Sequence, residues 1–254
     1  LTDHEIVLLN NCSIATARND IEMIYNKYQD IFDVVISSHK IEFKNKSVST
    51  LREVMRELFD QSITIQILLN VFYEPGKSRQ FHCDYSGISE ASFYRIVNDI
   101  NTGLNEAKFS IVFRNKGYYL QANNELELRR FMVSLLIEAK KSDEAFKEIP
   151  FETLYEILYK HTLKELPYKY EMQFYYYTFY AYVTLLRESQ GFTTEIDSVD
   201  NLYIEEYSLL KGFFPSLNPS HLIVLRQTLL AQIYPWKSES EKQRMHFAFE
   251  YFID

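Results

Sequence analysis

Residues Ser89–Gln121 read SEASFYRIVNDINTGLNEAKFSIVFRNKGYYLQ, and this stretch decides the fold that we expect for the chain. Ser89 suits the N-cap of a helix, because its hydroxyl can accept a backbone N–H of the first turn. Apolar side chains then recur at helical spacing and predict one buried face: Phe93, Ile96, Val97, Ile100 and Leu104. Two short strands follow, with a polar turn between them: Ser110–Phe113, then Arg114, Asn115 and Lys116, then Gly117–Gln121.

Two further helices are predicted upstream of this stretch. Ser62–Tyr73 is apolar at helical spacing and is followed by Pro75 and Gly76, which end helices. A shorter helix, Lys77–Tyr85, leads through a glycine-bearing turn to Ser89. Three helices and a hairpin in this order outline a winged helix-turn-helix module, whose third helix lies in the major groove of DNA. Its candidate DNA contacts are Ser89, Ser92, Tyr94, Arg95 and Asn98, next to Glu90 on the outward face, with Arg114 and Lys116 on the hairpin.

The first part of the chain repeats this pattern in weaker form, at an offset of 76 residues. The pairs at this offset are Ser13 with Ser89, Ala15 with Ala91, Thr16 with Ser92, Ile24 with Ile100, Lys40 with Lys116 and Phe43 with Tyr119. With one residue of slip, Leu51-Arg52 and Val54-Met55 fall on Leu128-Arg129 and Phe131-Met132. The sequence therefore predicts two tandem modules.

In this first module Ser13 is the expected helix cap, and a buried stripe is predicted at Ile14, Ala17, Ile21, Ile24 and Tyr28. Val34–Ser37 and Ile41–Lys44 form its expected hairpin. Its candidate DNA contacts are Ser13, Thr16, Arg18 and Asn19. At the same offset Leu1 pairs with Lys77, so nothing matches the helix Ser62–Tyr73. We therefore expect a longer protein whose first module is incomplete at its N-terminus.

The rest of the chain predicts helices alone. The helix Asn124–Lys141 leaves the second hairpin, and a charged break at residues 140–144 marks the expected domain boundary. Five helical stretches follow: Pro150–Leu166, Lys169–Gln190, Val199–Phe214, Pro219–Tyr234 and Ser238–Ile253. The tyrosine-rich run 168–182 suits core packing or dimerisation better than base stacking, because acids flank it. The expected fold is mainly α: winged modules at 1–60 and 61–140, then an all-α bundle at 141–254.

Charge and composition limit the possible functions. The formal net charge is −8, but residues 1–140 hold 16 Lys and Arg against 18 Asp and Glu, and residues 141–254 hold 11 against 17. Most of the excess negative charge thus lies outside the part of the chain that we expect to bind DNA. Cys12 and Cys83 stand singly, so we expect reduced thiols, and no phosphate loop, nucleophile elbow or zinc motif is present. We expect no enzymatic activity, cofactor or metal, and a soluble cytoplasmic protein that does not enter a membrane.

A second reading stays open. The two modules can be degenerate winged helices that no longer bind DNA, in a protein whose acidic helical half recruits a protein partner. The net charge favours this reading, whereas the order of cap, turn and wing favours DNA binding.

The combined pattern resembles the Mga and AtxA group of virulence regulators from Gram-positive bacteria. The residues that carry the resemblance are Asn11, Cys12, Ser13, Thr16, Arg18, Asn19, Asp20 and Ile21 in the first module, and Ser89, Ser92, Phe93, Tyr94, Arg95 and Asn115–Tyr118 in the second. The resemblance implies a transcriptional activator of virulence-type genes with a helical phosphotransferase-system (PTS) regulation domain. It further implies a homodimer through the C-terminal helices, and PTS proteins as partners.

In such a regulation domain a histidine usually stands six residues before an arginine. With Arg187 as this arginine, the place is taken by Ala181, and a second expected histidine is replaced by Thr228. Which of His161, His221 and His246 is phosphorylated, if any, stays open.

Overall fold

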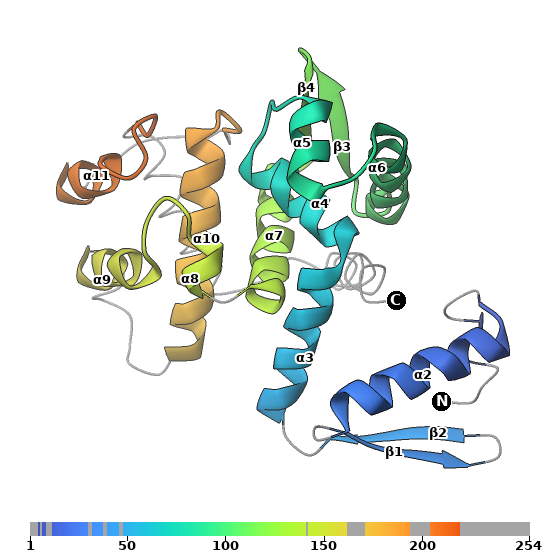
Figure 1. The fold of residues 1–254 in the computed structure, drawn as a ribbon. Coiled ribbons are helices and arrows are strands. Elements are labelled where there is room, and N and C mark those ends of the chain that lie inside the picture. The colour runs from blue at the N-terminus through green and yellow to red at the C-terminus, as the bar shows by residue number, and fades with distance from the viewer. Residues whose placement is uncertain are drawn as a thin grey trace.

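In the computed structural model of the chain, the described residues are 5, 7–8, 12–29, 32–37, 40–45, 48–140, 142–161, 171–193 and 204–218. They form mostly helices, with two separate two-stranded antiparallel hairpins (Figure 1). This confirms the predicted fold class, mainly α with small β wings.

The second module has the predicted order of elements, and serine side chains begin its first three helices. Ser62, Ser78 and Ser89 each accept the backbone N–H three residues further on, which satisfies one unpaired donor of the first turn. Gly87 ends the second of these helices in the left-handed conformation. The elements are α4 (Ile63–Tyr73), α5 (Arg79–Ser86), α6 (Glu90–Leu104), β3 (Phe109–Arg114), β4 (Gly117–Ala122) and α7 (Glu125–Ala139).

The predicted apolar stripe of α6 is buried along its whole length. Phe93, Ile100 and Leu104 have no exposed surface, and Ile96 and Val97 are below one tenth exposed. They pack into one core with residues of α4, the hairpin and α7. The prediction for this face is therefore confirmed, and the opposite face of α6 is left toward solvent.

The first module repeats these elements: α2 (Ile14–Tyr28), β1 (Phe32–Ser37), β2 (Lys40–Asn45) and α3 (Val48–Gln61). The ends of α2 correspond to those of α6 at the offset of 76, Ile14 to Glu90 and Tyr28 to Leu104. The strands instead correspond one residue later, because the loop before β3 is one residue longer than the loop before β1. Lys40 therefore corresponds to Gly117 and not to Lys116, and Phe43 to Leu120 and not to Tyr119.

One residue of the predicted stripe in α2 is placed wrongly. Ile14 is 50% exposed, whereas Ala17, Ile21 and Tyr28 are buried and the partly buried Ile24 packs against Tyr28 and Val54. Ile14 is the first residue of its helix and corresponds to Glu90, which is also exposed. In both modules the buried stripe begins one turn later.

Helix α3 connects the two modules. Its Val54 packs against Tyr28 of α2, and the Tyr28 hydroxyl donates to Glu57 at 3.1 Å. Further along, Phe59 of the same helix belongs to the core of the second module, where α3 packs against α4 and α7. Helix α3 thus packs against both modules (Figure 1).

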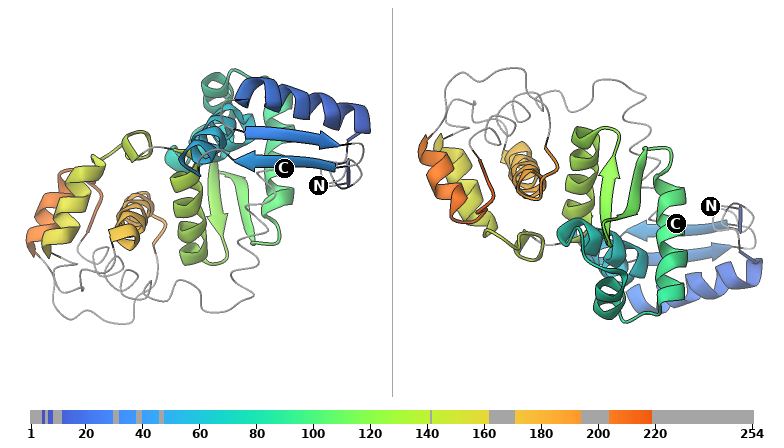
Figure 2. Two further views of the ribbon diagram at one scale, coloured as in Figure 1. Left: turned by 90° about the horizontal axis from the view of Figure 1, so that it is seen from below. Right: turned by 90° about the horizontal axis from the view of Figure 1, so that it is seen from above.

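The C-terminal helices share the core of the second module. Helix α10 packs against α7, and the core runs without a break from Phe59 of α3 to Leu217. Figure 2 shows these helices at one end of the molecule, α2 with β1 and β2 at the other, and the second module between. The elements are α8 (Ser142–Ala145), α9 (Phe151–His161), α10 (Glu171–Ser189) and α11 (Ile204–Lys211).

Core packing of the tyrosine-rich run is confirmed for Tyr177, Phe179, Tyr180 and Tyr182, which are all buried. The predicted helices Pro219–Tyr234 and Ser238–Ile253 lie outside the described residues, as do Tyr168 and Tyr170. The boundaries of the three domains stay a prediction.

Candidate nucleic-acid interface

The outward face of α6 carries the polar side chains that the sequence assigned to DNA. Tyr94 is 62% exposed, and Arg95 and Asn98 are exposed beside it. Within the described part of the chain, the side chains of Arg95 and Asn98 make no hydrogen bond or ion pair. Their donors and acceptors are therefore available to a ligand.

The serine hydroxyls at the start of α6 form hydrogen bonds within the first turn of the helix. The Ser89 hydroxyl accepts the Ser92 N–H at 3.2 Å, and the two hydroxyls lie 3.0 Å apart. Ser13 and Thr16 repeat this arrangement in α2, at 3.1 Å and 2.8 Å. Since these four hydroxyls are engaged within the protein, they are weaker candidates for DNA contact than Arg95 or Asn98. Ser92 is also partly buried.

Glu90 at the N-terminus of α6 forms an ion pair, which compensates its negative charge. Glu90 accepts from Arg79 of α5 at 3.0 Å, and both side chains are about half exposed. Exposed pairs contribute little to stability. This pair nevertheless offsets a negative charge at the end of the helix that would meet a phosphate backbone.

The hairpin turns through two residues with positive φ. Arg114 pairs with Gly117 across the strands, and Asn115 and Lys116 between them have φ of 47° and 65°. Positive φ at both central residues is the pattern of a type I′ turn, which favours Asn first and Gly second. Arg114 is thus the last residue of β3, and a lysine stands where glycine would be less strained. Exposed Phe113 lies beside this tip and was not singled out from the sequence.

Both strands of the hairpin form hydrogen bonds to the helical part of the module. Gly76 N donates to Tyr118 O at 2.8 Å and Tyr118 N to Lys77 O at 3.0 Å, so β4 pairs with the turn after α4. A Cβ on Gly117 would overlap the backbone of Gly76, which explains the glycine here. On the other strand, the side-chain amide of Asn101 in α6 both donates to and accepts from the backbone of Ile111, at 3.0 and 2.7 Å.

A buried histidine lies under the same surface. The ring of His82 in α5 stacks on Phe93 of α6 at 5.8 Å between ring centroids and meets Tyr118 of β4 edge-on at 6.0 Å. Burial lowers the pKa of His82 to about 4, because charging the ring would cost its solvation. A neutral imidazole is therefore part of the packing between α5, α6 and the hairpin.

Arg114 extends over a ring on the outer face of the hairpin. Its guanidinium carbon lies 4.4 Å from the centroid of the Tyr119 ring. The two residues are diagonal neighbours, because Val112 is directly opposite Tyr119. Arg114 and Lys116 are both exposed, so the tip presents two cations.

The first module presents its two remaining candidates in the same way. Arg18 and Asn19 are exposed on α2, as predicted. Arg18 already interacts with another group of the protein. The face of α2 is also more apolar than that of α6, because Ile14 and Met23 are 50% and 65% exposed.

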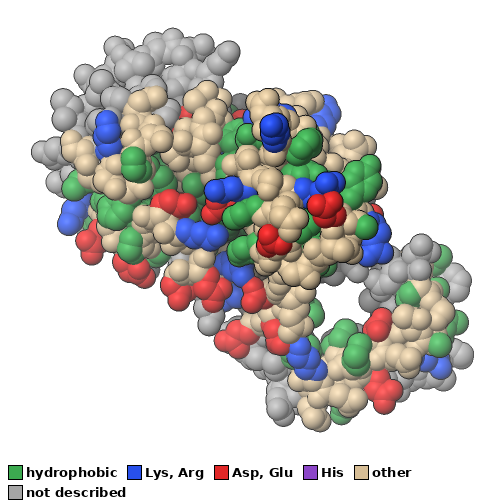
Figure 3. All heavy atoms as spheres, turned by 45° about the horizontal axis from the view of Figure 1, so that its top comes forward, with side chains coloured by type: hydrophobic (Ala, Val, Ile, Leu, Met, Phe, Trp, Pro, Cys, Tyr) green, Lys and Arg blue, Asp and Glu red, His purple; other side chains and the backbone are tan. Residues whose placement is uncertain are grey.

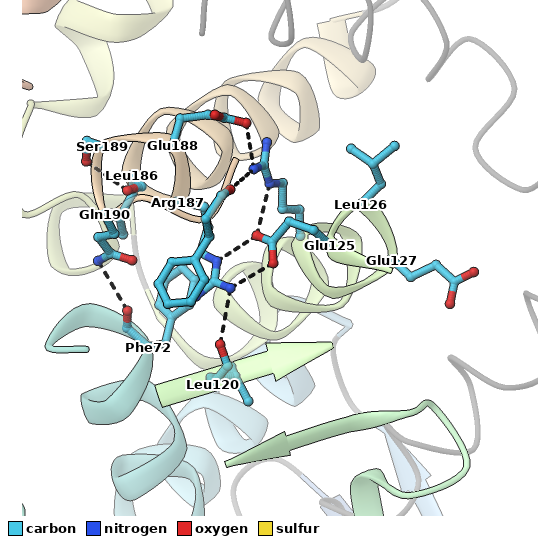
Figure 4. A network of polar contacts seen from close by, with 12 residues as sticks. Phe72, Leu120, Glu125, Leu126, Glu127, Leu186, Arg187, Glu188, Ser189 and Gln190 are labelled. Carbon is cyan, nitrogen blue, oxygen red and sulfur yellow. Dashed lines mark hydrogen bonds and ion pairs between the residues drawn. The ribbon is translucent and has the colours of Figure 1, made fainter. Parts of the chain in front are cut away.

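Sequence reasoning missed a buried ionic network between the second module and α10. Arg187 of α10 donates to both carboxylate oxygens of Glu125 at 2.7 and 2.8 Å, and to the carbonyl of Leu120 at 3.1 Å (Figure 4). Arg129 of α7 donates to Glu188 at 2.7 Å, and neither side chain is exposed. The spacing of Glu125 and Arg129 by one helical turn was the available signal, but that pattern normally marks a surface pair.

Charged side chains are unevenly distributed over the surface. Figure 3 shows Lys and Arg scattered over this face with some acids among them, and a row of Asp and Glu along its lower edge. No group of three or more His, Cys, Asp or Glu side chains able to hold a metal ion occurs among the described residues. Nor is any helix in the described ranges long and apolar enough to cross a membrane.

Sequence comparison finds similarity to known proteins in this part of the chain. The family described as the Mga helix-turn-helix domain matches residues 47–136, which extend from α3 into α7. The chain is 26% identical over 163 residues to a protein of Streptococcus pneumoniae serotype 4 named "Putative trans-acting regulator". That match covers 62% of the chain and 32% of the relative, so the chain spans about a third of the relative's length. Residues 47–136 thus match a Mga helix-turn-helix domain, and the chain is similar to Mga-like regulators over this part of its length.

Proposed function

We propose that the chain binds double-stranded DNA as the DNA-binding part of a transcriptional regulator, without enzymatic activity. In this proposal α6 lies in the major groove and the β3–β4 hairpin contacts the sugar–phosphate backbone. The observation that carries it is the outward face of α6, where Arg95 and Asn98 are exposed and, among described residues, unpaired. The match of residues 47–136 to a helix-turn-helix domain supports the same function.

The chemistry of this face suits base edges. A guanidinium can donate two hydrogen bonds to O6 and N7 of guanine, and a side-chain amide can pair with N6 and N7 of adenine. Arg95 and Asn98 are three residues apart and therefore lie about one turn along the same face of α6. We infer that they contact neighbouring base pairs.

The chemistry of the hairpin suits phosphates. Arg114 and Lys116 are exposed cations at its tip, and most contacts to the DNA backbone come from such residues. A lysine held at positive φ costs about 1–2 kcal/mol relative to an unstrained position. Strain retained at an exposed tip supports a functional role for that charge.

The experiment uses duplexes enriched from a random-sequence pool by the chain itself, followed by affinity measurements at several salt concentrations. The double variant Arg95→Ala, Lys116→Ala is expected to lose most of the binding and, through loss of the phosphate contact of Lys116, to reduce the slope of log K against log salt by about 1. The matched control is Lys160→Ala with Lys211→Ala, which removes the same charge from exposed positions on α9 and α11. Equal affinity and slope for both double variants would contradict the proposal.

The rival function is a protein-interaction module, which the net charge of −8 favours. It predicts that no duplex is enriched from the pool, and that any weak binding follows total charge. The two double variants would then behave alike, so the same experiment separates the two functions.

Three finer proposals follow from the family alone. The chain would belong to an activator of virulence-type genes, would form a homodimer through its C-terminal helices, and would have PTS proteins as partners. Light scattering coupled to size-exclusion chromatography tests the second of these: a mass of about twice 30.3 kDa supports it, and a monomer at every concentration contradicts it for this chain.

A further inference from the structure

Helix α10 ends in a turn that folds an aromatic ring back onto its own arginine. Gly191 has φ of +85°, and its N–H donates to Glu188 O at 3.0 Å, while Phe192 N donates to Arg187 O at 3.0 Å. These are the two hydrogen bonds of a Schellman cap, in which glycine takes the left-handed position. The cap brings the ring of Phe192 to 3.5 Å from the guanidinium carbon of Arg187.

The same turn is fastened to the second module on three sides. Arg129 of α7 donates to the carbonyl of Phe192 at 2.7 Å. Arg187 donates to the carbonyl of Leu120 in β4, and Gln190 donates to the carbonyls of Phe72 and Tyr73 at the end of α4, both at 3.3 Å (Figure 4). The end of α10 is thus held by backbone and buried side-chain groups that do not depend on the Phe192 ring.

From this fixed point a chain of ring contacts reaches the hairpin tip. The centroids of Phe192 and Tyr119 lie 6.4 Å apart at an interplanar angle of 63°, an edge-to-face arrangement. Tyr119 in turn carries the guanidinium of Arg114 at 4.4 Å. The ring of Tyr119 therefore has Phe192 of the C-terminal part as one neighbour and a cation of the hairpin tip as another.

We propose that Phe192 is a positioning residue for DNA binding, which holds the Tyr119 ring so that Tyr119 presents Arg114 to a phosphate. The proposal rests on the proposed DNA-binding function of the hairpin. A guanidinium stacked on an aromatic face keeps its N–H donors in its own plane, so they stay available for a phosphate. Through this contact the end of α10 sets the geometry of the hairpin tip, and a change in the helical part reaches the DNA-binding surface.

A double-mutant cycle between Phe192 and Arg114 tests the coupling. Phe192→Ala is expected to weaken duplex binding about two- to fivefold. This factor corresponds to the free energy of one exposed cation–π contact. In a chain that already carries Arg114→Ala, the same change is expected to have no further effect. Phe192→Tyr keeps the ring and should restore the affinity. The matched control Tyr159→Ala removes a part-exposed ring from α9 and should bind as the unchanged chain does.

Amide hydrogen exchange of residues 109–122 in the free protein keeps the inference separate from DNA binding. Phe192→Ala should speed exchange in this peptide, and Tyr159→Ala should not. Additive effects of Phe192→Ala and Arg114→Ala on affinity, or unchanged exchange in the hairpin, would overturn the inference. If the unchanged chain binds no duplex, the proposed function fails, and the exchange experiment still decides whether Phe192 positions the hairpin.

Discussion

At the scale of single residues, a change at Lys116 should affect protein stability and DNA binding differently. It occupies the second position of a type I′ turn at φ of 65°, where glycine is favoured. Lys116→Gly relieves this strain but makes the unfolded chain more flexible, so the free energy of unfolding should stay equal or rise by up to about 1 kcal/mol. Duplex binding should weaken in the same variant. Urea unfolding and affinity measured side by side test this, and a loss of stability would refute the strain argument.

His82 gives the second residue-scale prediction. Its pKa of about 4 in the folded chain lies below the ordinary histidine value of about 6.5, so the folded state favours the neutral ring. The stability that this ring contributes is complete above pH 6.5 and is lost as the pH falls toward 4. Linkage predicts a loss of about 2 kcal/mol between pH 7 and pH 5. Urea unfolding at the two pH values should show a smaller loss for His82→Phe, and equal losses would place the titration elsewhere.

At the scale of elements, the ionic network that joins α7 and α10 should be far more sensitive than a surface pair. Arg187 is fully buried, and its removal takes the donor from the Leu120 carbonyl and leaves Glu125 with Arg129 as its remaining partner in the network. Arg187→Ala should therefore cost about 3–5 kcal/mol. Lys140→Ala, which removes the partly exposed pair with Asp60, should cost at most about 1 kcal/mol. Similar losses for both variants in urea unfolding would show that the buried network adds nothing beyond a surface contact.

Most elements of the second module were predictable because their signals are local. Serine caps, the apolar stripe of α6 and the glycine-bearing turns each act within a few residues, and the helices begin where these signals stand. The outward placement of Arg95 followed from the same stripe. The Tyr119–Arg114 contact was within reach as well, since the two-residue turn fixes which side chains are diagonal neighbours.

What the sequence did not reveal depends on contacts between distant segments. Arg129 and Arg187 look like surface residues of two helices, and only the packing of α10 on α7 buries them together. The shift in the repeat arises in the same way, because one extra loop residue before β3 leaves no local trace. Ile14 was misplaced because periodicity predicts the face of a residue but not whether the first turn has a neighbour.

At the scale of the whole molecule, the second module and the C-terminal helices should unfold as one cooperative unit. One core contains residues of α6, α7 and α10, and the network of Arg187 spans its interface. In amide exchange, Arg187→Ala is therefore expected to lower the protection of α7 and α10 by similar amounts. Loss of protection in α10 alone would indicate that the two parts are independent units.

The central claim, that α6 enters the major groove, is tested most directly by DNA cleavage from a tether on that helix. Iron–EDTA is attached to Asn98→Cys in a chain with Cys12→Ser, where the remaining Cys83 is buried. The control places the cysteine at Lys160 of α9. We predict strand cleavage confined to a few base pairs, with the offset between strands that marks the major groove, from position 98 but not from position 160. Diffuse or absent cleavage from position 98 on a duplex that the chain binds would contradict the claim.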